Sequence, residues 1–269
     1  MDLQLRGQRA LVVGGASGIG LAIARAFARE GAGVMIWDRS EHTAVRAAEL
    51  TNETGSPCAG DSFDVTDFAR VQQAAAAAMA NFGSIDHIVY AAGMGSGKFG
   101  FPFWKLDPSD WDRVLRVNLL GAVNVAHALA PALAECGSGT MLFISSVAGQ
   151  IGSQTDPPYS AAKAALLNFA MAAAKDLAPR KVRVNSICPG MIQTPLNRSV
   201  CQAWNDQQPA DNKRSYEDWA GEKVRTVIPL QRWQTPEDIG ELAVFLASAK
   251  AQNITGQTLN VDGGWVMHW

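Results

Sequence analysis

Short apolar runs alternate along the whole chain with longer segments in which apolar residues recur at helical spacing. Seven of the short runs are predicted strands: Ala10–Val13, Gly33–Trp37, Cys58–Phe63, Ile85–Tyr90, Met141–Ser145, Val182–Ile187 and Thr258–Val261. Strands that are apolar on both faces and separated by helices are typical of a parallel sheet covered on both sides. The pattern therefore predicts an α/β protein with a doubly wound, parallel sheet of about seven strands.

The segments between the strands carry signals for the start and end of helices. Helices are expected to begin near Gly18, Glu41, Asp67, Pro108, Pro158 and Pro236. Asp67 is a plausible N-cap, Thr235 precedes a proline and two acids, and Gly83 follows the Ala74–Ala78 run. The chain shows no repeat and no linker, so residues 1–269 are predicted to form a single domain. The polar segment at about 196–225 interrupts the alternation and is predicted to form a helical excursion outside the sheet.

Composition excludes several classes of protein. With 23 Lys+Arg against 25 Asp+Glu the formal charge is −2, and 48% of the 269 residues are hydrophobic. Disorder needs a lower hydrophobic content, and nucleic-acid binding needs a basic patch, so neither is expected. The N-terminal sequence lacks a secretory leader, and the four cysteines show no CxxC spacing. These features predict a cytoplasmic protein with reduced thiols.

Two uncharged stretches, Val117–Ala134 and Cys136–Thr155, are long enough to raise the question of a membrane span. The first carries Asn118, His127 and Pro131, and the second is rich in Gly, Ser, Thr and Gln. Neither is expected to cross a membrane. The four histidines show no metal-ligand spacing and no HExxH occurs, so no catalytic metal is predicted.

The first predicted strand runs into the sequence GGASGIG, residues 14–20, and a predicted helix follows directly. A glycine-rich turn between strand and helix lets the backbone approach a pyrophosphate, whose charge then lies at the positive helix N-terminus. The alternative is a plain tight turn. The strand, turn and helix context favours nucleotide binding.

Asp38 lies eighteen residues after Gly20, at the end of the second predicted strand. An acid at this place can accept hydrogen bonds from the adenosine ribose hydroxyls and would repel a 2′-phosphate. NAD is therefore favoured over NADP. Two alternatives remain at this point: Asp38 is a solvated turn acid, or the adjacent Arg39 holds a phosphate.

Tyr159 and Lys163 are four residues apart at the start of an Ala-rich helical segment, so they share one helix face. A phenol with a pKa near 10 is a poor base at neutral pH, and lowering that pKa to about 7 requires about 4 kcal/mol of preferential stabilisation of the phenolate. A neighbouring ammonium supplies part of it. By itself the pair also fits an ordinary wet helix face.

Over its full length the chain resembles the short-chain dehydrogenases/reductases of the NAD(P)-dependent type. The glycine turn resembles the family's TGxxxGxG, the sequence DVTD at 64–67 its adenine-contacting loop, and Ala91-Ala92-Gly93 its NAG motif. The catalytic tetrad matches Asn118, Ser146, Tyr159 and Lys163, and Ser146 rather than Ser145 is indicated because it precedes the tyrosine by 13 residues. The sequence PGMIQT at 189–194 resembles the nicotinamide loop, and VDGG at 261–264 resembles the family's closing strand.

The resemblance implies hydride transfer between C4 of the nicotinamide and a secondary alcohol or ketone carbon. Tyr159 is then the general base in oxidation and the general acid in reduction, and Ser146 binds the substrate oxygen. Lys163 holds the nicotinamide ribose and lowers the pKa of the tyrosine. Asn118 anchors a water that relays the proton. The expected cofactor-binding residues are Gly14, Ser17, Gly18, Ile19, Gly20, Asp38, Asp64, Val65, Ala91, Ala92, Gly93, Tyr159, Lys163, Pro189, Gly190, Ile192 and Thr194.

Two positions depart from the family pattern. Val13 replaces the motif's Thr, and Ala91 replaces its Asn. The resemblance assigns both family residues to hydrogen bonds between loops. Their loss affects the rigidity of the cofactor pocket rather than activity.

Substrate selectivity is expected to come from residues 94–104, from the loop after Ser146 and from the 196–225 excursion. Met94, Gln150, Gln154 and Arg198 are the candidate substrate residues, and Gln202 is a further polar group near the expected mouth. They favour a sugar, sugar acid or polyol, while a cyclic or steroidal alcohol and a 3-oxoacyl thioester remain alternatives. The aromatic residues of 99–104 either line this pocket or are simple packing.

The C-terminal sequence WVMHW, residues 265–269, is unusually bulky for a chain end. It either packs on its own domain or lies in a subunit interface and caps a neighbour's site. The family resemblance implies a homotetramer. Two other classes of function stay open: an NAD-binding regulator without turnover, and an epimerase or dehydratase that recycles its NAD.

Overall fold

The computed structural model describes residues 2–267, which contain one seven-stranded sheet. All strand pairs are parallel, in the order β3-β2-β1-β4-β5-β6-β7. The strands are β1 (Arg9–Val13), β2 (Gly33–Asp38), β3 (Cys58–Ser62), β4 (His87–Tyr90), β5 (Thr140–Ile144), β6 (Arg183–Pro189) and β7 (Thr258–Val261). Each predicted strand is present, with its ends displaced by at most two residues. The predicted doubly wound α/β fold is confirmed.

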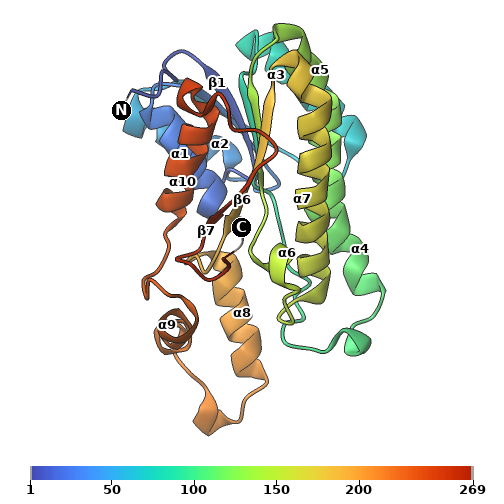
Figure 1. The fold of residues 1–269 in the computed structure, drawn as a ribbon, viewed down its shortest axis with the longest axis vertical. Coiled ribbons are helices and arrows are strands. Elements are labelled where there is room, and N and C mark those ends of the chain that lie inside the picture. The colour runs from blue at the N-terminus through green and yellow to red at the C-terminus, as the bar shows by residue number, and fades with distance from the viewer. Residues whose placement is uncertain (1, 268–269) are drawn as a thin grey trace.

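Helices cover both faces of the sheet (Figure 1). One layer contains α1 (Gly18–Arg29), α2 (Thr43–Thr54) and α10 (Pro236–Ala247), and the other contains α3 (Phe68–Phe82), α5 (Gly121–Cys136) and α7 (Pro157–Leu177). The shorter elements are η1 (Phe103–Lys105), α4 (Ser109–Leu115), the π-turn η2 (Arg116–Leu120), α6 (Ala148–Ile151), η3 (Ala178–Arg180) and η5 (Ala249–Ala251). Residues 195–227 form α8 (Pro195–Asp206), η4 (Ala210–Asn212) and α9 (Tyr216–Val227), which project beyond one end of the sheet (Figure 1).

The helix ends have local causes. The Asp67 side chain accepts a hydrogen bond from the Arg70 amide at 3.1 Å and so caps α3, which ends at Gly83 with φ +75°. Thr235 and Asp238 form a reciprocal capping box at the start of α10. The predicted helix starts agree with the structure to within two residues.

Two apolar layers hold the sheet between the helices. On one face Val71, Leu129 and Leu166 pack against the sheet, and on the other Ile23, Phe27 and Ile239 do so. A third, smaller cluster joins α8 and α9 to the rest of the fold, with Met191, Cys201, Trp219, Ala220, Val224 and Ile228 as its buried members. The sheet therefore rests on far more buried apolar surface than the α8 and α9 segment does.

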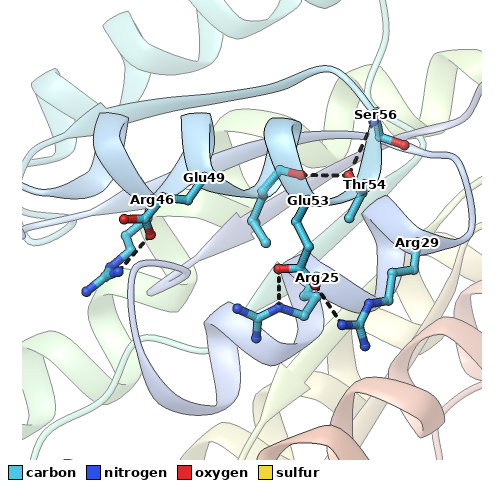
Figure 2. A network of polar contacts seen from close by, with 8 residues as sticks. Arg25, Arg29, Arg46, Glu49, Glu53, Thr54 and Ser56 are labelled. Atoms are coloured by element: carbon cyan, nitrogen blue, oxygen red, sulfur yellow. Dashed lines mark hydrogen bonds and ion pairs between the residues drawn. The ribbon is translucent and has the colours of Figure 1, made fainter.

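Polar contacts tie α1 to α2 at the surface (Figure 2). The Glu53 carboxylate on α2 accepts from Arg25 Nε at 3.0 Å and from Arg29 Nη2 at 2.6 Å, both on α1. Arg46 and Glu49 form a further pair within α2 at 2.7 Å. Because these side chains are largely exposed, solvent screens the ion pairs.

Residues 109–136 form one helical run that is long and apolar enough, by length and composition, to cross a membrane, and 39% of its most apolar stretch is buried in the fold. The expectation that the composition of this segment rules out a membrane span is therefore wrong. The buried side of the run belongs to the core of the domain, with Val125, Leu129 and Leu133 at 1% exposure each. The absence of a membrane partner stays a prediction.

Candidate active site

A cavity lies at the carboxyl ends of the strands, where the chain order of the sheet reverses between β1 and β4. Ligands of open parallel α/β sheets bind at this switch point. The cavity has a volume of about 1100 Å³ and extends from the glycine turn to α8 and α9. It is large enough for a dinucleotide and a small substrate together.

The glycine turn brings backbone close to the cavity floor. A Cβ on Gly14 would lie 2.5 Å from the Ala92 amide nitrogen, and one on Gly20 would lie 2.0 Å from the Gly14 carbonyl oxygen. Gly18 has φ +53° and faces open space, where the Thr194 methyl at 3.8 Å is its only near neighbour. The turn therefore packs β1 against α1 while leaving room above it.

The N-terminus of α1 opens into the same space. Ser17 is the N-cap, but its side chain makes no capping bond, and the first turn of the helix has no acid. Ser17, Gly18, Ile19 and Gly20 all line the cavity. Free amide groups at a positive helix end, with no competing carboxylate, fit the pyrophosphate of a dinucleotide.

Asp38 lies at the end of β2 and lines the cavity beside Arg39. Its Oδ2 accepts a hydrogen bond from the Ala16 amide, and its Oδ1 accepts one from the Ser40 amide, each at 3.0 Å. A carboxylate oxygen has two lone pairs, so both oxygens can still accept from ribose hydroxyls. Asp38 thus holds the glycine turn and remains available to a ligand.

The remaining predicted cofactor residues surround the same cavity. Asp64, Val65, Ala91, Ala92, Gly93, Pro189, Gly190, Ile192 and Thr194 all line it. Val65 is fixed by its carbonyl, which accepts from Asn124 Nδ2 at 3.0 Å. Thr194 caps α8 by accepting from the Asn197 amide at 3.2 Å, and a Cβ on Gly190 would lie 2.7 Å from Asp262 Cα.

Tyr159 and Lys163 lie on α7 and both face the cavity, together with Ser146. The Lys163 ammonium is 5.5 Å from the centroid of the Tyr159 ring and donates to the Ile144 carbonyl at 2.7 Å. Ser146 follows β5, and its hydroxyl lies close enough to the Tyr159 phenol to lower the pKa of that group. The structure therefore brings the three predicted catalytic side chains to one point of the cavity wall.

Burial dominates the titration of this pair in the chain without ligands. Burial raises the pKa of Tyr159 to about 12, and the Ser146 hydroxyl partly offsets this rise. Burial also lowers the pKa of Lys163 to about 8. At neutral pH the phenol is protonated and the lysine is mostly charged. The lowered tyrosine pKa that the resemblance implies is not a property of the chain alone.

Asn118 and Ser145 have structural contacts. The Asn118 side chain is fully buried in the π-turn, where Nδ2 donates to the Met94 carbonyl at 2.7 Å and to the Val114 carbonyl at 2.9 Å. Ser145 Oγ donates to the Lys163 carbonyl at 2.9 Å. Asn118 therefore holds the Met94 loop beside the site, and its side chain does not line the cavity.

Of the candidate substrate residues, Met94 lines the cavity, whereas Gln150, Gln154 and Arg198 lie outside its lining. Gln150 exchanges two 2.9 Å hydrogen bonds with the Asn260 amide. Gln154 lines a second hollow with the exposed Phe103 and Trp104. Arg198 lies 4.2 Å above the Tyr216 ring and 3.9 Å from Glu217. Contacts made elsewhere on the protein thus occupy the side chains of Gln150 and Arg198, while Gln154 lines the second hollow.

Sequence reasoning missed several residues of the cavity wall, among them Asp156, Trp219 and Lys223. Asp156 is 5% exposed, and while its Oδ2 accepts from the Ser96 amide at 2.8 Å, its Oδ1 has no partner among the described residues. Burial raises the pKa of this carboxyl. The position of Asp156 three residues before Tyr159 was a usable signal, whereas α9 carries no motif.

Among residues 2–267, no group of three or more His, Cys, Asp or Glu side chains is placed to hold a metal ion. The prediction of no catalytic metal stays a prediction. The cavity is instead surrounded by the glycine turn, a helix N-terminus and the Tyr159 group.

Comparisons with known proteins agree with this geometry. A family model described as enoyl-(acyl carrier protein) reductase matches residues 14–266. The chain is 34% identical to 3-oxoacyl-(acyl-carrier-protein) reductase FabG of Chlamydia muridarum, over 98% of this chain and 99% of the relative. It is also 34% identical to D-threitol dehydrogenase of Mycolicibacterium smegmatis, over 99% of this chain and 95% of the relative.

A similar solved structure is that of L-sorbose reductase from Gluconobacter frateurii in complex with NADPH and L-sorbose. It superposes with a TM-score of 0.91 at 27% sequence identity and covers 100% of both chains. The match extends over the sheet and also over the segment that contains α8 and α9.

Proposed function

Because the chain belongs to the short-chain dehydrogenase/reductase family, whose members are oxidoreductases acting on alcohols and ketones, we propose that it is an NAD-dependent enzyme for a secondary alcohol, or the corresponding ketone, of a sugar, sugar acid or polyol. One observation carries the proposal. The Tyr159 phenol, with Ser146 and Lys163 around it, faces the same cavity as the glycine turn. The proton-transfer group and the cofactor-binding group can therefore act on one substrate.

A nicotinamide held in this cavity would supply the hydride acceptor for oxidation and the hydride donor for reduction. The chain's own residues handle the proton and the geometry. The Tyr159 hydroxyl takes the alcohol proton during oxidation and donates one to the ketone oxygen during reduction. The Ser146 hydroxyl binds the same substrate oxygen and so fixes its distance from Tyr159.

Lys163 and Asn118 support this step from behind the cavity wall. The Lys163 charge, held at the Ile144 carbonyl, favours the phenolate form of Tyr159 and lies where a nicotinamide ribose would be bound. Asn118 positions the Met94 loop. Its role as a water anchor is part of the proposal and would depend on its backbone, since its side-chain donor is used by two carbonyls.

NAD is the proposed cofactor because Asp38 lines the ribose end of the cavity. Its negative charge is fixed there by the amides of Ala16 and Ser40 and would repel a 2′-phosphate. Arg39 is the residue that favours the alternative, and the L-sorbose reductase structure contains NADPH. Measuring activity with both cofactors decides between the two.

Asp156 favours a hydroxylated substrate. Asp156 lines the cavity, and its carboxyl oxygens are acceptors to which a substrate hydroxyl can donate. The similarity to D-threitol dehydrogenase and to L-sorbose reductase supports a polyol or sugar. The similarity to FabG supports a second candidate, a 3-oxoacyl thioester, and a cyclic or steroidal alcohol is a third.

Two other classes of function make different predictions. A regulator that binds NAD without turnover would have no use for the Tyr159 and Ser146 pair. An epimerase or dehydratase that recycles its NAD would form product with no net change in nicotinamide absorbance. Both classes are disfavoured by the resemblance to enzymes named as dehydrogenases and reductases.

We also retain a cytoplasmic homotetramer as part of the proposal. The described part of the C-terminal segment folds back on its own chain: the Val266 amide donates to Asp262 Oδ2 at 2.7 Å, and Trp265 lines the cavity. His268 and Trp269 lie outside the described residues. Deleting residues 266–269 should change the oligomer mass or the substrate KM, and unchanged values of both would count against an interface role.

The experiment is a panel of sugars, sugar acids, polyols, cyclic alcohols and a 3-oxoacyl thioester, each with NAD(H) and NADP(H), followed by nicotinamide absorbance. We expect turnover of at least one hydroxylated compound with NAD and weaker turnover with NADP. Selective reduction of the thioester would move the assignment to the second candidate. Product formation without absorbance change would identify a recycling enzyme.

A further inference from the structure

The α9 end of the cavity contains a lysine that the proposed chemistry does not use. Lys223 lines the cavity wall and is partly buried, and its ammonium lies 3.8 Å from the centroid of the Trp219 ring. Trp219 is 4% exposed and lines the same wall. The charge is thus held over a buried aromatic face at the substrate end of the site.

Lys223 has no carboxylate partner among residues 2–267. The neighbouring acids on α9 are engaged elsewhere, since Glu217 lies 3.9 Å from Arg198 and Glu222 pairs with Arg214. Lys223 also donates no hydrogen bond to any described residue, which leaves its three N–H donors free. Burial lowers its pKa, although the neighbouring Cys201 acts in the opposite direction.

The aromatic contact does not replace a counter-ion. A cation over a tryptophan face is stabilised by the ring but keeps its unpaired donors. A charge that is partly removed from water is stabilised only when an opposite charge or several acceptors reach it. The Trp219 indole N–H, which also has no partner among the described residues, is a second unsatisfied donor in this wall.

The other cations that line the cavity differ from Lys223. Arg116 pairs with Asp112 at 2.7 Å, and both Arg39 and Arg113 are exposed. Lys163 is buried beside Tyr159 and donates to the Ile144 carbonyl. Lys223 is therefore the cation of the described wall that is both partly desolvated and without an oxygen partner.

We propose that Lys223 binds a carboxylate of the substrate, so that the substrate is a hydroxy acid or keto acid rather than a neutral polyol. One lysine, with no arginine in that part of the wall, matches the single charge of a carboxylate better than the double charge of a phosphate. This inference rests on the proposed function and adds the second point at which the substrate is held. The carbinol would lie at Tyr159 and the carboxylate at Lys223.

The test uses pairs of compounds that differ only in a terminal carboxylate: gluconate and sorbitol, lactate and propane-1,2-diol, 3-hydroxybutyrate and butane-1,3-diol. Oxidation with NAD is measured for the wild type, Lys223→Met and Lys223→Arg, with Lys213→Met as an exposed control outside the cavity. We expect kcat/KM for the acid to exceed that for its alcohol, and Lys223→Met to lower the acid's value by about 10- to 100-fold, mostly through KM. Lys223→Arg and Lys213→Met should keep the preference.

A binding measurement makes the result independent of turnover. Calorimetric titration of the acids should give a Kd that Lys223→Met weakens by the same factor and that high salt also weakens. A preference for the neutral compounds, or an acid preference that survives Lys223→Met, overturns the role of Lys223 and leaves the proposed function intact. Absence of turnover across this set and the wider panel, with NAD still bound, counts against the proposed function itself.

Discussion

The two ends of the cavity are built in different ways. At the cofactor end, backbone atoms of the glycine turn lie against strand ends that belong to a continuous apolar core. At the substrate end, α8 and α9 form a cap (residues 195–227, called the α8–α9 cap) that rests on a cluster with six buried residues. The cap also contains the unpartnered Trp219 N–H and the uncompensated Lys223. The proposed cofactor end is thus built on the apolar core of the sheet, while the proposed substrate end is a cap with a smaller buried cluster and a lysine without an oxygen partner.

This difference separates what the fold requires from what the substrate requires. At the cofactor end Asp38 is held by its own contacts, since its two oxygens each accept an amide, while the amides at the start of α1 stay available to a ligand. In the cap, the Lys223 ammonium has no oxygen partner among the described residues and can bind a ligand. Substitutions at the cofactor end should therefore affect stability and NAD binding together, whereas those in the cap should affect KM.

The largest expected effect is that of Gly20→Ala. The new Cβ would lie 2.0 Å from the Gly14 carbonyl oxygen, so α1 has to move away from the turn, at a cost of about 3 kcal/mol or more. The matched control is Gly221→Ala in the α8–α9 cap, where the nearest atom is Arg225 Nη1 at 3.4 Å and the change should stabilise α9 by up to about 1 kcal/mol. Thermal unfolding measures both, and equal Tm values for the two variants would remove the contrast between the two ends.

The second effect is acid destabilisation of the sheet through His87 on β4. Burial lowers the pKa of His87 to about 3, and its ring nitrogens contact Thr140 Oγ1 at 2.8 Å and Gln8 Oε1 at 2.5 Å. The unfolded chain binds this proton below about pH 6.5 and the folded chain does not, so stability rises with pH between about 3 and 6.5. From pH 7 to 5 the free energy of unfolding should fall by about 2 kcal/mol.

The His87 contribution is isolated by comparison with His87→Gln. Urea unfolding at pH 7 and pH 5 should show a smaller loss on acidification in the variant, since the proton-binding group is gone. An identical loss in both proteins would assign the acid effect to other groups. The α8–α9 cap contains no histidine, so its opening, followed by hydrogen exchange, should not change through this group.

The third effect concerns cofactor choice. Asp38→Asn removes the negative charge, so kcat/KM with NAD should fall about tenfold and that with NADP should rise, because the repulsion of a 2′-phosphate is lost. Steady-state kinetics with both cofactors measure the ratio. An equal loss with NAD and NADP would mean that Asp38 serves only to hold the amides of Ala16 and Ser40.

The smallest expected effect is that of Glu53→Gln at the α1–α2 surface (Figure 2). Nearby Arg25 and Arg29 hold the pKa of Glu53 below its usual value, but Glu53 and Arg29 are exposed and Arg25 is partly exposed. The loss should be less than about 1 kcal/mol and should shrink in high salt. A larger, salt-independent loss would show that this surface network contributes as much as core packing.

The sequence predicted the sheet, and the residues that line the cavity at the glycine turn, because their signals are local. A strand, a glycine turn and a helix follow one another within residues 9–29, and Tyr159 and Lys163 share one helical face by spacing alone. The substrate end was predicted less well. Whether Gln150 faces the cavity or Asn260 depends on contacts between residues 110 positions apart.

Lys223 is a second residue whose place in the cavity wall could not be predicted from the sequence. In the sequence it is one of several charged residues of a polar segment, and nothing in its spacing marks it. Its significance comes from the placement of α9 over the sheet end, beside Trp219, and from the pairing of its neighbours Glu217 and Glu222 with other residues. Long-range packing of the α8–α9 cap therefore decides which side chains face the substrate.

The most direct test of the central claim measures NAD binding and turnover in the same preparation of wild type and Tyr159→Phe. The variant keeps the ring against Lys163 but loses the hydroxyl that exchanges the proton. The account predicts a cofactor Kd within about twofold of the wild type and a kcat reduced by about 10²- to 10⁴-fold on the active substrate. Turnover at the wild-type rate in Tyr159→Phe would contradict the claim that this cavity performs proton transfer through Tyr159.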